Sequence, residues 1–425
     1  MNIIQELRHY LDDCNSPYHL IKEVSANLKQ LGFKELSMKA AFNLVPGEKY
    51  FVSPSGTSLF AFVMPEDIKS IRIGMGHTDF PTFKLKPVPM ENPKAGCNLI
   101  NVEPYGGSLK KTWFDRPLGI AGAVLVKGED VFKPATLLYD SINPMVVIPS
   151  IAPHLDKEAD KREIDVAKEI KPLCGLTLDG DNFDILEEIA KDLRVKKSDI
   201  LSFDLNLYDV TDSTLIGAYE DMLQSQKIDN YSSCVALVKA INTDSEANVM
   251  PLIALFDNEE IGSRTRQGAD SNMLEWVINK ICLDSGVCEC APEVYEILAN
   301  SMMLSCDVAH AVHPSHTEKS DSTSTAYMGK GITIKTSASR RYVTDPEALA
   351  IVRGLCECND ISYQVQANKS GTPGGQTLGP LATSYIPIKA ADVGIPMLAM
   401  HSVSELCAVS DVEEFGRLVS SFFKE

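Results

Sequence analysis

The sequence predicts an α/β protein in which a helix-flanked, mixed but largely parallel sheet is interrupted by an inserted β-rich domain. Residues 249–256 (VMPLIALF) form a short and almost wholly apolar run, which is typical of a strand covered on both faces by helices. Amphipathic helical patterns flank this run, whereas short β-rich pieces separated by Pro and Gly turns fill the region 87–217. A chain of 425 residues is also too long for one ordinary core, so two domains are expected.

The change in pattern sets the predicted domain boundaries. The first domain is expected to comprise 1–86 and 218–425, with 87–217 inserted between its two parts. Insertions of this kind commonly serve oligomerisation or form a lid, and the pattern does not distinguish these roles.

The spacing of apolar residues predicts the individual elements. Ser16 followed by Pro17 is an N-cap and first-turn pair, which marks the start of a helix. The predicted helices cover 2–13, 17–31, 182–194, 232–242, 269–282, 292–304 and 411–423. The predicted strands of the first domain include 58–64, 71–75, 249–256, a run GITIKTSASRRY with an exposed Lys335 near its end, and a penultimate strand ending in His401.

Composition limits the classes of protein to consider. No apolar run approaches the roughly 20 residues that span a bilayer, and the first residues lack a basic-then-apolar signal pattern, so a cytoplasmic protein is expected. The eleven cysteines are odd in number and scattered, which fits a reducing compartment. A net charge of -18 argues against nucleic acid or an anionic membrane as a partner.

Carboxylates gather where the apolar strand 249–256 ends. Asp257, Glu259 and Glu260 follow it, and ligands of open α/β sheets bind beyond the carboxyl ends of the strands. Adjacent like charges repel, but a divalent metal between them would relieve the repulsion and leave one carboxylate free as a base. The alternative is a solvated acidic turn.

Other polar groups occupy similar positions. His77 and Asp79 follow the strand 71–75, and alternation places them on the same side, where the carboxylate can orient the imidazole for a metal. The alternatives are a surface histidine in a turn and, for Asp229 at a helix start, an ordinary cap. A glycine-rich turn (GTPGGQTLGP) lacks the Lys-Ser/Thr ending of a phosphate-binding loop.

Taken together, these groups predict a site for two zinc ions. Two histidines and three carboxylates would supply one nitrogen per metal, one terminal carboxylate per metal and one bridge, while the remaining carboxylates serve as base and as orienting group. Magnesium would favour fewer imidazoles and calcium more oxygens, so cobalt and manganese are the alternatives to zinc. The residues concerned are His77, Asp79, Asp229, Glu259, Glu260, Asp307 and His401.

The chain resembles the aspartyl aminopeptidase family of two-zinc metallopeptidases from end to end. The resemblance lies in the motifs GMGHTDFP, TWFDRPL, IPSIAPHLD, KIDNYSS, FDNEEIGS, SCDVAHAVHP, KTSASRRY and LAMHS, which occur in the family's order. It implies a catalytic sheet domain, an inserted dimerisation domain, and dimers that assemble into a homo-oligomeric dodecamer. It also implies peptide substrates, with Asp or Glu preferred at the amino terminus.

The resemblance also implies a role for individual residues. The implied zinc ligands are His77, Asp229, Glu260, Asp307 and His401, with Asp229 bridging. Glu259 would be the general base and Asp79 the residue that orients His77. Substrate contacts would come from His154, His310, Lys335 and Tyr342, with His154 reaching the site of a neighbouring subunit.

The sequence departs from the family pattern at three positions and leaves two other functions open. Phe80, Ser315 and Gly371 replace a serine, an asparagine and an acidic residue, respectively, which bears on pocket shape and substrate preference. A related two-zinc acyl-amino-acid deacylase or carboxypeptidase would need a cation for the substrate carboxylate, and Arg340 and Arg341 are available. A non-enzymatic scaffold would be expected to lack ligands, and none is missing.

Overall fold

A computed structural model describes residues 1–158, 161–177, 183–243, 245–372 and 374–425. The chain divides into two compact units. Unit 1 contains 1–79, 213–400 and 405–425, and unit 2 contains 80–212 together with 401–404. The boundaries predicted for the inserted domain, after residue 86 and after residue 217, remain predictions.

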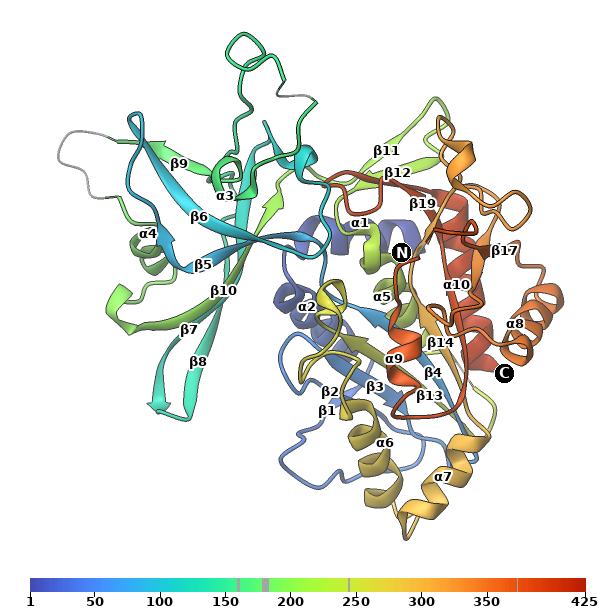
Figure 1. The fold of residues 1–425 in the computed structure, drawn as a ribbon. Helices are drawn as coiled ribbons and strands as arrows, with labels where there is room; N and C mark the ends of the chain where they lie inside the picture. The colour runs from blue at the N-terminus through green and yellow to red at the C-terminus, as the bar shows by residue number, and fades with distance from the viewer. Residues whose placement is uncertain (159–160, 178–182, 244, 373) are drawn as a thin grey trace. The chain divides into compact units, whose positions relative to one another are not determined.

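Unit 1 is built on a mixed sheet of nine described strands (Figure 1). Five of its eight strand pairings are parallel, so the predicted mixed, largely parallel sheet is confirmed. In spatial order the strands are β1 (Lys34–Glu35), β2 (Lys49–Val52), β3 (Leu59–Val63), β13 (Val249–Phe256), β4 (Ser70–His77), β14 (Met302–Cys306), β18 (Lys389–Gly394), β16 (Ile332–Thr336) and β17 (Tyr363–Ala367).

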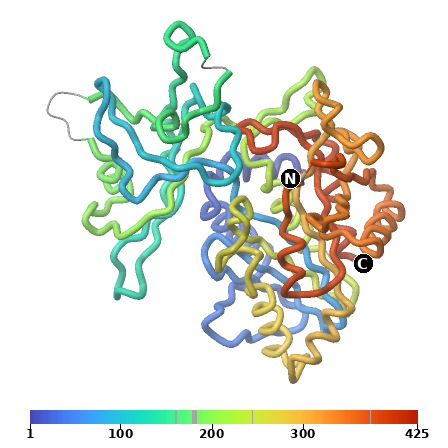
Figure 2. The backbone as a smooth tube through the Cα atoms, viewed as in Figure 1, coloured from blue at the N-terminus to red at the C-terminus, as the bar shows by residue number. Residues whose placement is uncertain are grey.

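Helices cover both faces of this sheet. The α-helices of unit 1 are α1 (Ile3–Asp13), α2 (Pro17–Gln30), α5 (Ile228–Ala240), α6 (Met273–Asp284), α7 (Ala291–Ala299), α8 (Pro346–Cys358), α9 (Leu378–Ala382) and α10 (Val409–Lys424). A second, smaller sheet contains β11 (Thr214–Ile216), β12 (Met222–Ser225), β20 (Glu405–Ala408), β19 (Pro396–Leu398) and β15 (Ala309–His310). Figure 2 shows that unit 1 combines the blue N-terminal segment with yellow-to-red segments from the second half of the chain.

The central strand β4 alternates between two packing environments. A Cβ atom at Gly74 would lie only 2.2 Å from Leu237 of α5 and 3.0 Å from Phe423 of α10, so glycine lets these helices approach the sheet. Ile73 and Met75 belong to a buried cluster that also contains apolar residues of α6 and α7. Strand β4 is therefore held between two apolar layers up to its carboxyl end.

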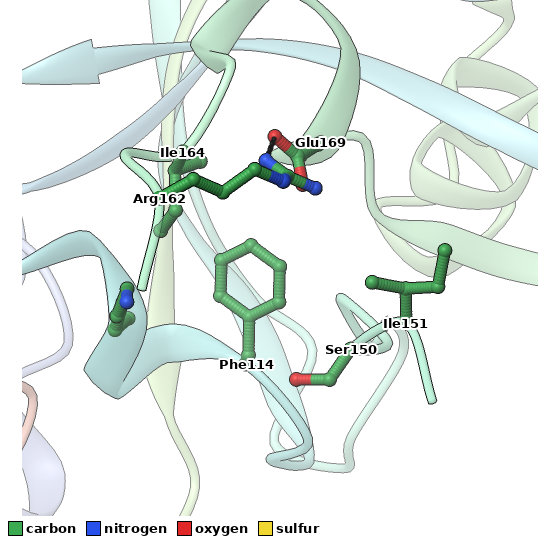
Figure 3. Close-up of a pocket in the computed structure, with 7 residues that line it drawn as sticks. Phe114, Ser150, Ile151, Arg162, Ile164 and Glu169 are labelled. Carbon is green, nitrogen blue, oxygen red and sulfur yellow. Dashed lines mark hydrogen bonds and ion pairs between the residues drawn. The ribbon is translucent and has the colours of Figure 1, made fainter. Parts of the chain in front are cut away.

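Unit 2 is an antiparallel β structure. Its strands, in spatial order, are β8 (Lys133–Asp140), β7 (Leu118–Asp130), β10 (Ile200–Asp209), β5 (Thr82–Met90), β6 (Cys97–Tyr105) and β9 (Leu173–Leu176). Its short helices are α3 (Val166–Glu169) and α4 (Ile185–Asp192). A cavity of about 170 Å³ lies around Phe114, where Arg162 donates two 2.7 Å hydrogen bonds to Glu169 (Figure 3).

Most predicted elements of unit 1 are present. Ser16 caps α2, and the helices predicted at 2–13, 17–31, 232–242 and 411–423 correspond to α1, α2, α5 and α10. The helix predicted at 292–304 is wrong at its end, because α7 stops at Ala299 and 302–306 form the buried strand β14. The helix predicted at 182–194 corresponds to α4, although residue 182 lies outside the described residues. Within the described part of the chain, no helix combines the length and apolarity needed to cross a membrane.

Candidate metal centre

His77 is the last residue of β4 and is buried. Its Nδ1 atom lies 3.0 Å from the backbone carbonyl oxygen of Asp79 and 3.4 Å from the Asp79 carboxylate. Two acceptors at Nδ1 favour the tautomer in which this nitrogen carries the proton, and Nε2 is then available to a metal. The carboxylate therefore lies close to His77, but the backbone carbonyl makes the shorter contact.

The Asp79 carboxylate also holds the acidic turn that follows β13. One of its oxygens accepts a hydrogen bond from the Glu259 backbone N–H at 3.1 Å, and the other accepts from the Glu260 N–H at 3.2 Å. The turn begins beside His77, because Phe256 pairs with His77 in the parallel register of β13 and β4. Asp79 thus links the histidine to the two adjacent glutamates.

Three side chains form a cluster with the spacing of metal ligands. The Nε2 atom of His77 lies 3.3 Å from an oxygen of Asp229, and His77, Asp229 and Glu260 each offer one donor atom within 4.8 Å of the others. Asp229 lies at the start of α5 but has non-helical backbone angles, and its N–H donates to Glu405 at 3.1 Å. Asp229 therefore lies at the start of a helix, as expected, and also belongs to the cluster.

Asp307 lies at the edge of the same cluster. One oxygen is 3.8 Å from His77 Nε2 and accepts a 2.9 Å hydrogen bond from the Asn230 amide. The other oxygen is 3.2 Å from the Lys335 ammonium, which also donates to the Val308 carbonyl at 3.0 Å. The Asp307 carboxylate is therefore held from two sides.

The prediction that Lys335 is exposed is wrong. Its side chain is only 2% exposed, because Lys335 lies on the inner strand β16 between β17 and β18. A buried ammonium needs compensating charge, and Asp307 provides it. The local sequence pattern favours an exposed lysine at this position, since strand lysines are usually exposed.

The pKa values reflect the crowding of charges. Burial lowers the pKa of His77, but its contacts with Asp229, Asp307 and Asp79 outweigh this and raise the pKa well above its usual range. Burial raises the pKa of the Glu259 carboxyl to about 8, where the charge of His77 opposes the rise and the neighbouring aspartates add to it. For Asp307, burial would raise the pKa, but Lys335 and His77 bring it below its usual value.

These donors fit a zinc ion. Imidazole nitrogen and carboxylate oxygen are both common zinc ligands, and the cluster brings one imidazole together with two carboxylates from separate segments of the chain. The same carboxylates favour a positive charge at His77, and a bound cation would supply that charge.

The other predicted site residues lie in several places. Tyr342 is buried, with its ring 5.2 Å from the Lys335 ammonium. His310 is exposed in β15 and lines a polar cavity of about 240 Å³ with His313 and His316. His154 is exposed in unit 2. The structure therefore brings only part of the predicted set together within unit 1.

His401 belongs to unit 2. Its Nδ1 atom lies 3.2 Å from the Gly107 carbonyl oxygen. The backbone φ angle of His401 is +66°, in the left-handed region that non-glycine residues seldom adopt. Other non-glycine residues of the described chain, such as Asn258 and Ser263, share this conformation, so it does not by itself mark His401 as a site residue.

Sequence reasoning missed three buried residues around the cluster. Asn230 contacts Asp307, Glu405 accepts from the Asp229 N–H, and Asp392 lies opposite Lys335 in the sheet. Asn230 and Glu405 each lie one or a few residues from a predicted ligand, which was the available signal. Asp392 lies inside the run KAADVG, where only its charge within a buried strand sets it apart.

The fold and this cluster define an α/β protein with a candidate metal centre beside the carboxyl ends of its central strands. The family model "Aminopeptidase I zinc metalloprotease (M18)" matches residues 10–423. The chain therefore belongs to the M18 aminopeptidase family and is a zinc-dependent metallopeptidase.

Similar proteins span nearly the whole chain. A "Probable M18 family aminopeptidase 2" from Clostridium novyi is 34% identical over 96% of this chain and 95% of its own length. "Aspartyl aminopeptidase 4" from Saccharomyces cerevisiae is 32% identical over 99% of this chain and 94% of its own. The structure of the Ape4 and Nbr1 complex contains a similar chain with a TM-score of 0.92, 29% identity and coverage of 99% and 85%. The S. cerevisiae mApe1 dodecamer has a TM-score of 0.84, 27% identity and coverage of 99% and 96%.

Proposed function

We propose that this aminopeptidase releases amino-terminal Asp or Glu from peptides at a centre that holds two zinc ions. The single observation that carries the proposal is the convergence of His77, Asp229 and Glu260, which lie far apart in the sequence, within 4.8 Å of one another. The acidic preference is supported by similarity to relatives called aspartyl aminopeptidases and by a buried lysine beside the cluster.

The balance of charge supports two ions instead of one. The cluster contains five carboxylates, from Asp79, Asp229, Glu259, Glu260 and Asp307. When His77 is neutral as a ligand and all five carboxylates are ionised, the Lys335 ammonium offsets at most one of these charges, which leaves at least four negative charges. One divalent ion neutralises only half of that surplus, and two neutralise it.

We assign the ligands as the family resemblance implies them. His77, Asp229, Glu260, Asp307 and His401 would hold the ions, with Asp229 as the bridge. Zinc, when bound, supplies positive charge that polarises a carbonyl oxygen and makes water more acidic. Cobalt and manganese favour similar ligands and are the alternative metals.

Glu259 is proposed as the general base. Its backbone N–H is fixed by Asp79, and it lies next to the proposed ligand Glu260 in the same turn. Glu259 would accept a proton from the attacking water and deliver it to the leaving amine when the peptide bond breaks. His154 would steady the developing oxyanion, in the site of a neighbouring subunit, and His310 would contact the substrate.

Lys335 is proposed to recognise the acidic side chain of the substrate. Two of the three N–H groups of its ammonium donate hydrogen bonds to Asp307 and to the Val308 carbonyl, and the third has no hydrogen-bond partner among the described residues. Tyr342 would form part of the same subsite, because its ring lies beside the ammonium. An acidic side chain would meet both a charge and a hydrogen-bond donor there.

The Glu259→Gln variant tests the mechanism. Glutamine retains the shape but cannot accept the proton, so turnover should fall at least a hundredfold while zinc content is retained. Asp257→Asn in the same turn is the matched control, since its side-chain oxygen can still accept from the Asn258 N–H. A near-normal rate in Glu259→Gln would remove Glu259 from the role of base.

Substrate choice distinguishes this function from the deacylase or carboxypeptidase alternative. Aspartyl, glutamyl, alanyl and leucyl anilides should be compared with N-acetyl-aspartyl anilide, together with a metal analysis of the purified protein. We expect aspartyl and glutamyl anilides to react fastest and the acetylated substrate to be inert. Equal turnover of free and acetylated substrates would contradict the aminopeptidase assignment.

We propose that unit 2 mediates homodimerisation and that dimers assemble into a dodecamer. The β7–β8 hairpin carries Val131 and Phe132, which are 91% and 95% exposed, and Leu155 is 81% exposed. Exposed apolar residues of this size favour contact with another protein surface. The similar mApe1 chain forms a dodecamer. Sedimentation analysis of the purified protein tests the oligomer size.

The eleven free cysteines support a reducing, cytoplasmic location.

A further inference from the structure

Asp392 is a buried carboxylate beside the acidic-residue subsite. It lies on β18, is 0% exposed, and pairs directly with Lys335 in the antiparallel register of β18 and β16. Directly opposite residues have their side chains on the same face, with Cβ atoms about 4.5–5.5 Å apart. The two opposite charges are therefore neighbours within a sheet that excludes water.

Asp392 also fixes the segment that follows Tyr342. One carboxylate oxygen accepts a 2.5 Å hydrogen bond from the Val343 N–H, and the Asp392 N–H donates to the Thr344 hydroxyl at 2.8 Å. Tyr342 directly precedes this segment, and its ring lies 5.2 Å from the Lys335 ammonium. A single residue is thus tied to both members of the proposed subsite.

The same strand supports the metal centre through its backbone. The carbonyl of Val393, the residue after Asp392, accepts the Asp307 N–H at 2.9 Å. Gly394 follows, and a Cβ atom there would lie 1.9 Å from the Asp307 carbonyl oxygen. Strand β18 therefore sets the positions of Asp307 and Lys335 relative to each other.

We propose that Asp392 is a positioning residue for acidic substrates, holding the Lys335 ammonium and the Tyr342–Thr344 segment in the geometry that binds a substrate carboxylate. Without the Asp392 charge, Lys335 has a single carboxylate partner, Asp307, and is drawn more strongly toward the metal centre. Lys335 then presents its third N–H less favourably to the substrate. The inference rests on the proposed preference for Asp or Glu.

The Asp392→Asn variant separates charge from shape. The asparagine oxygen can still accept from the Val343 N–H, so mainly the charge is removed. The kcat/KM ratio of aspartyl to leucyl anilide should fall at least tenfold, chiefly through a higher KM for the acidic substrate, with zinc content retained. A ratio within twofold of the parent would overturn the proposal.

Asp411→Asn is the matched control. Asp411 is also a 0% exposed aspartate, and it accepts hydrogen bonds from the Gly329 and Gly331 N–H groups at 2.6 and 2.8 Å. Its substitution should leave the substrate ratio unchanged. An equal fall of the ratio in both variants would show a general effect of removing a buried aspartate charge and would also overturn the proposal.

Thr344→Val gives a second test that avoids a buried aspartate substitution. Valine has the size of threonine but cannot accept the Asp392 N–H, so the ratio should fall at least threefold. An unchanged ratio would contradict the positioning role even if Asp392→Asn does not fold. The parent enzyme must be measured first, because a parent without acidic preference refutes the proposed specificity and this inference with it. A preference that is present in the parent and retained in both variants refutes this inference alone.

Discussion

The two hydrogen bonds of the Asp79 carboxylate predict a large effect of its removal. Asp79 is 1% exposed and accepts from the backbone N–H groups of Glu259 and Glu260. Hydrogen bonds to a charged group contribute about 1.5–3 kcal/mol each. The two hydrogen bonds are only part-buried, so water can replace part of the lost interaction, and Asp79→Ala should lower the free energy of unfolding by about 2–4 kcal/mol.

The same substitution should weaken zinc binding. Removing a group that orients a metal ligand typically costs 10–100-fold in metal affinity or activity, and Asp79 supports both His77 and Glu260. Urea unfolding measures the stability, and competition with a chromogenic chelator measures zinc affinity. The stability and zinc affinity of Asp79→Asn should lie between those of Asp79→Ala and the parent, because the asparagine amide offers one acceptor oxygen in place of two.

Asp204→Ala provides the control for loss of an ion pair elsewhere. Asp204 lies 2.7 Å from Lys84, but both side chains are partly exposed, so the expected loss is below about 1 kcal/mol. If Asp79→Ala loses no more stability than Asp204→Ala and retains zinc affinity within twofold, then Asp79 does not hold the turn in the way described.

The remaining predictions concern metal support and pH. Asn230→Leu removes the amide that donates to Asp307 at 2.9 Å and should weaken zinc binding 10–100-fold in the same chelator assay, while near-parental affinity would exclude an orienting role. Zinc removal should lower the Tm measured by calorimetry by several degrees, and zinc addition should restore it. The reason is that a ligand at a hundredfold excess over its Kd stabilises the folded state by about 2.7 kcal/mol. An unchanged Tm would contradict tight zinc binding to the folded state. Burial raises the pKa of Asp411 to about 6, so its folded form binds the proton more tightly than the unfolded chain. This stabilisation is present below about pH 4 and is lost as pH rises through 6, by about 2–3 kcal/mol in total. Asp411→Asn should flatten this part of the urea-unfolding profile, and an unchanged slope would contradict the assignment.

Much of the fold was predictable because its central strands are covered on both faces. The run 249–256 is apolar throughout, and it forms the buried strand β13. By contrast, 302–306 was predicted as the end of a helix because buried strands and buried helix segments have similar composition over a few residues. Only the pairing of β14 with β4 and β18 distinguishes them.

The candidate site was predictable where a polar residue follows an apolar strand. His77 and Glu260 stand out in this way, and the structure places them within 4.8 Å of each other and Asp229. The roles of His154, His310 and His401 as site residues remain predictions from the family resemblance. Nothing in the local sequence of these residues gives their distance from the centre.

Residues inside strands were harder to interpret, and Lys335 and Asp392 show the reason. A charged residue in a strand can either face solvent or be buried beside an opposite charge. Which of the two applies depends on a partner residue from another strand. In the register of β16 and β18, Lys335 pairs with Asp392, which is 57 positions away in the sequence. The local pattern around Lys335 therefore predicts an exposed side chain. Once the pair is seen, the identity of both residues is explained together, because either charge alone would be costly in this sheet. Lys335 contacts Asp307 and pairs with Asp392, so under the proposed acidic preference a change at either carboxylate should alter which substrates the enzyme prefers.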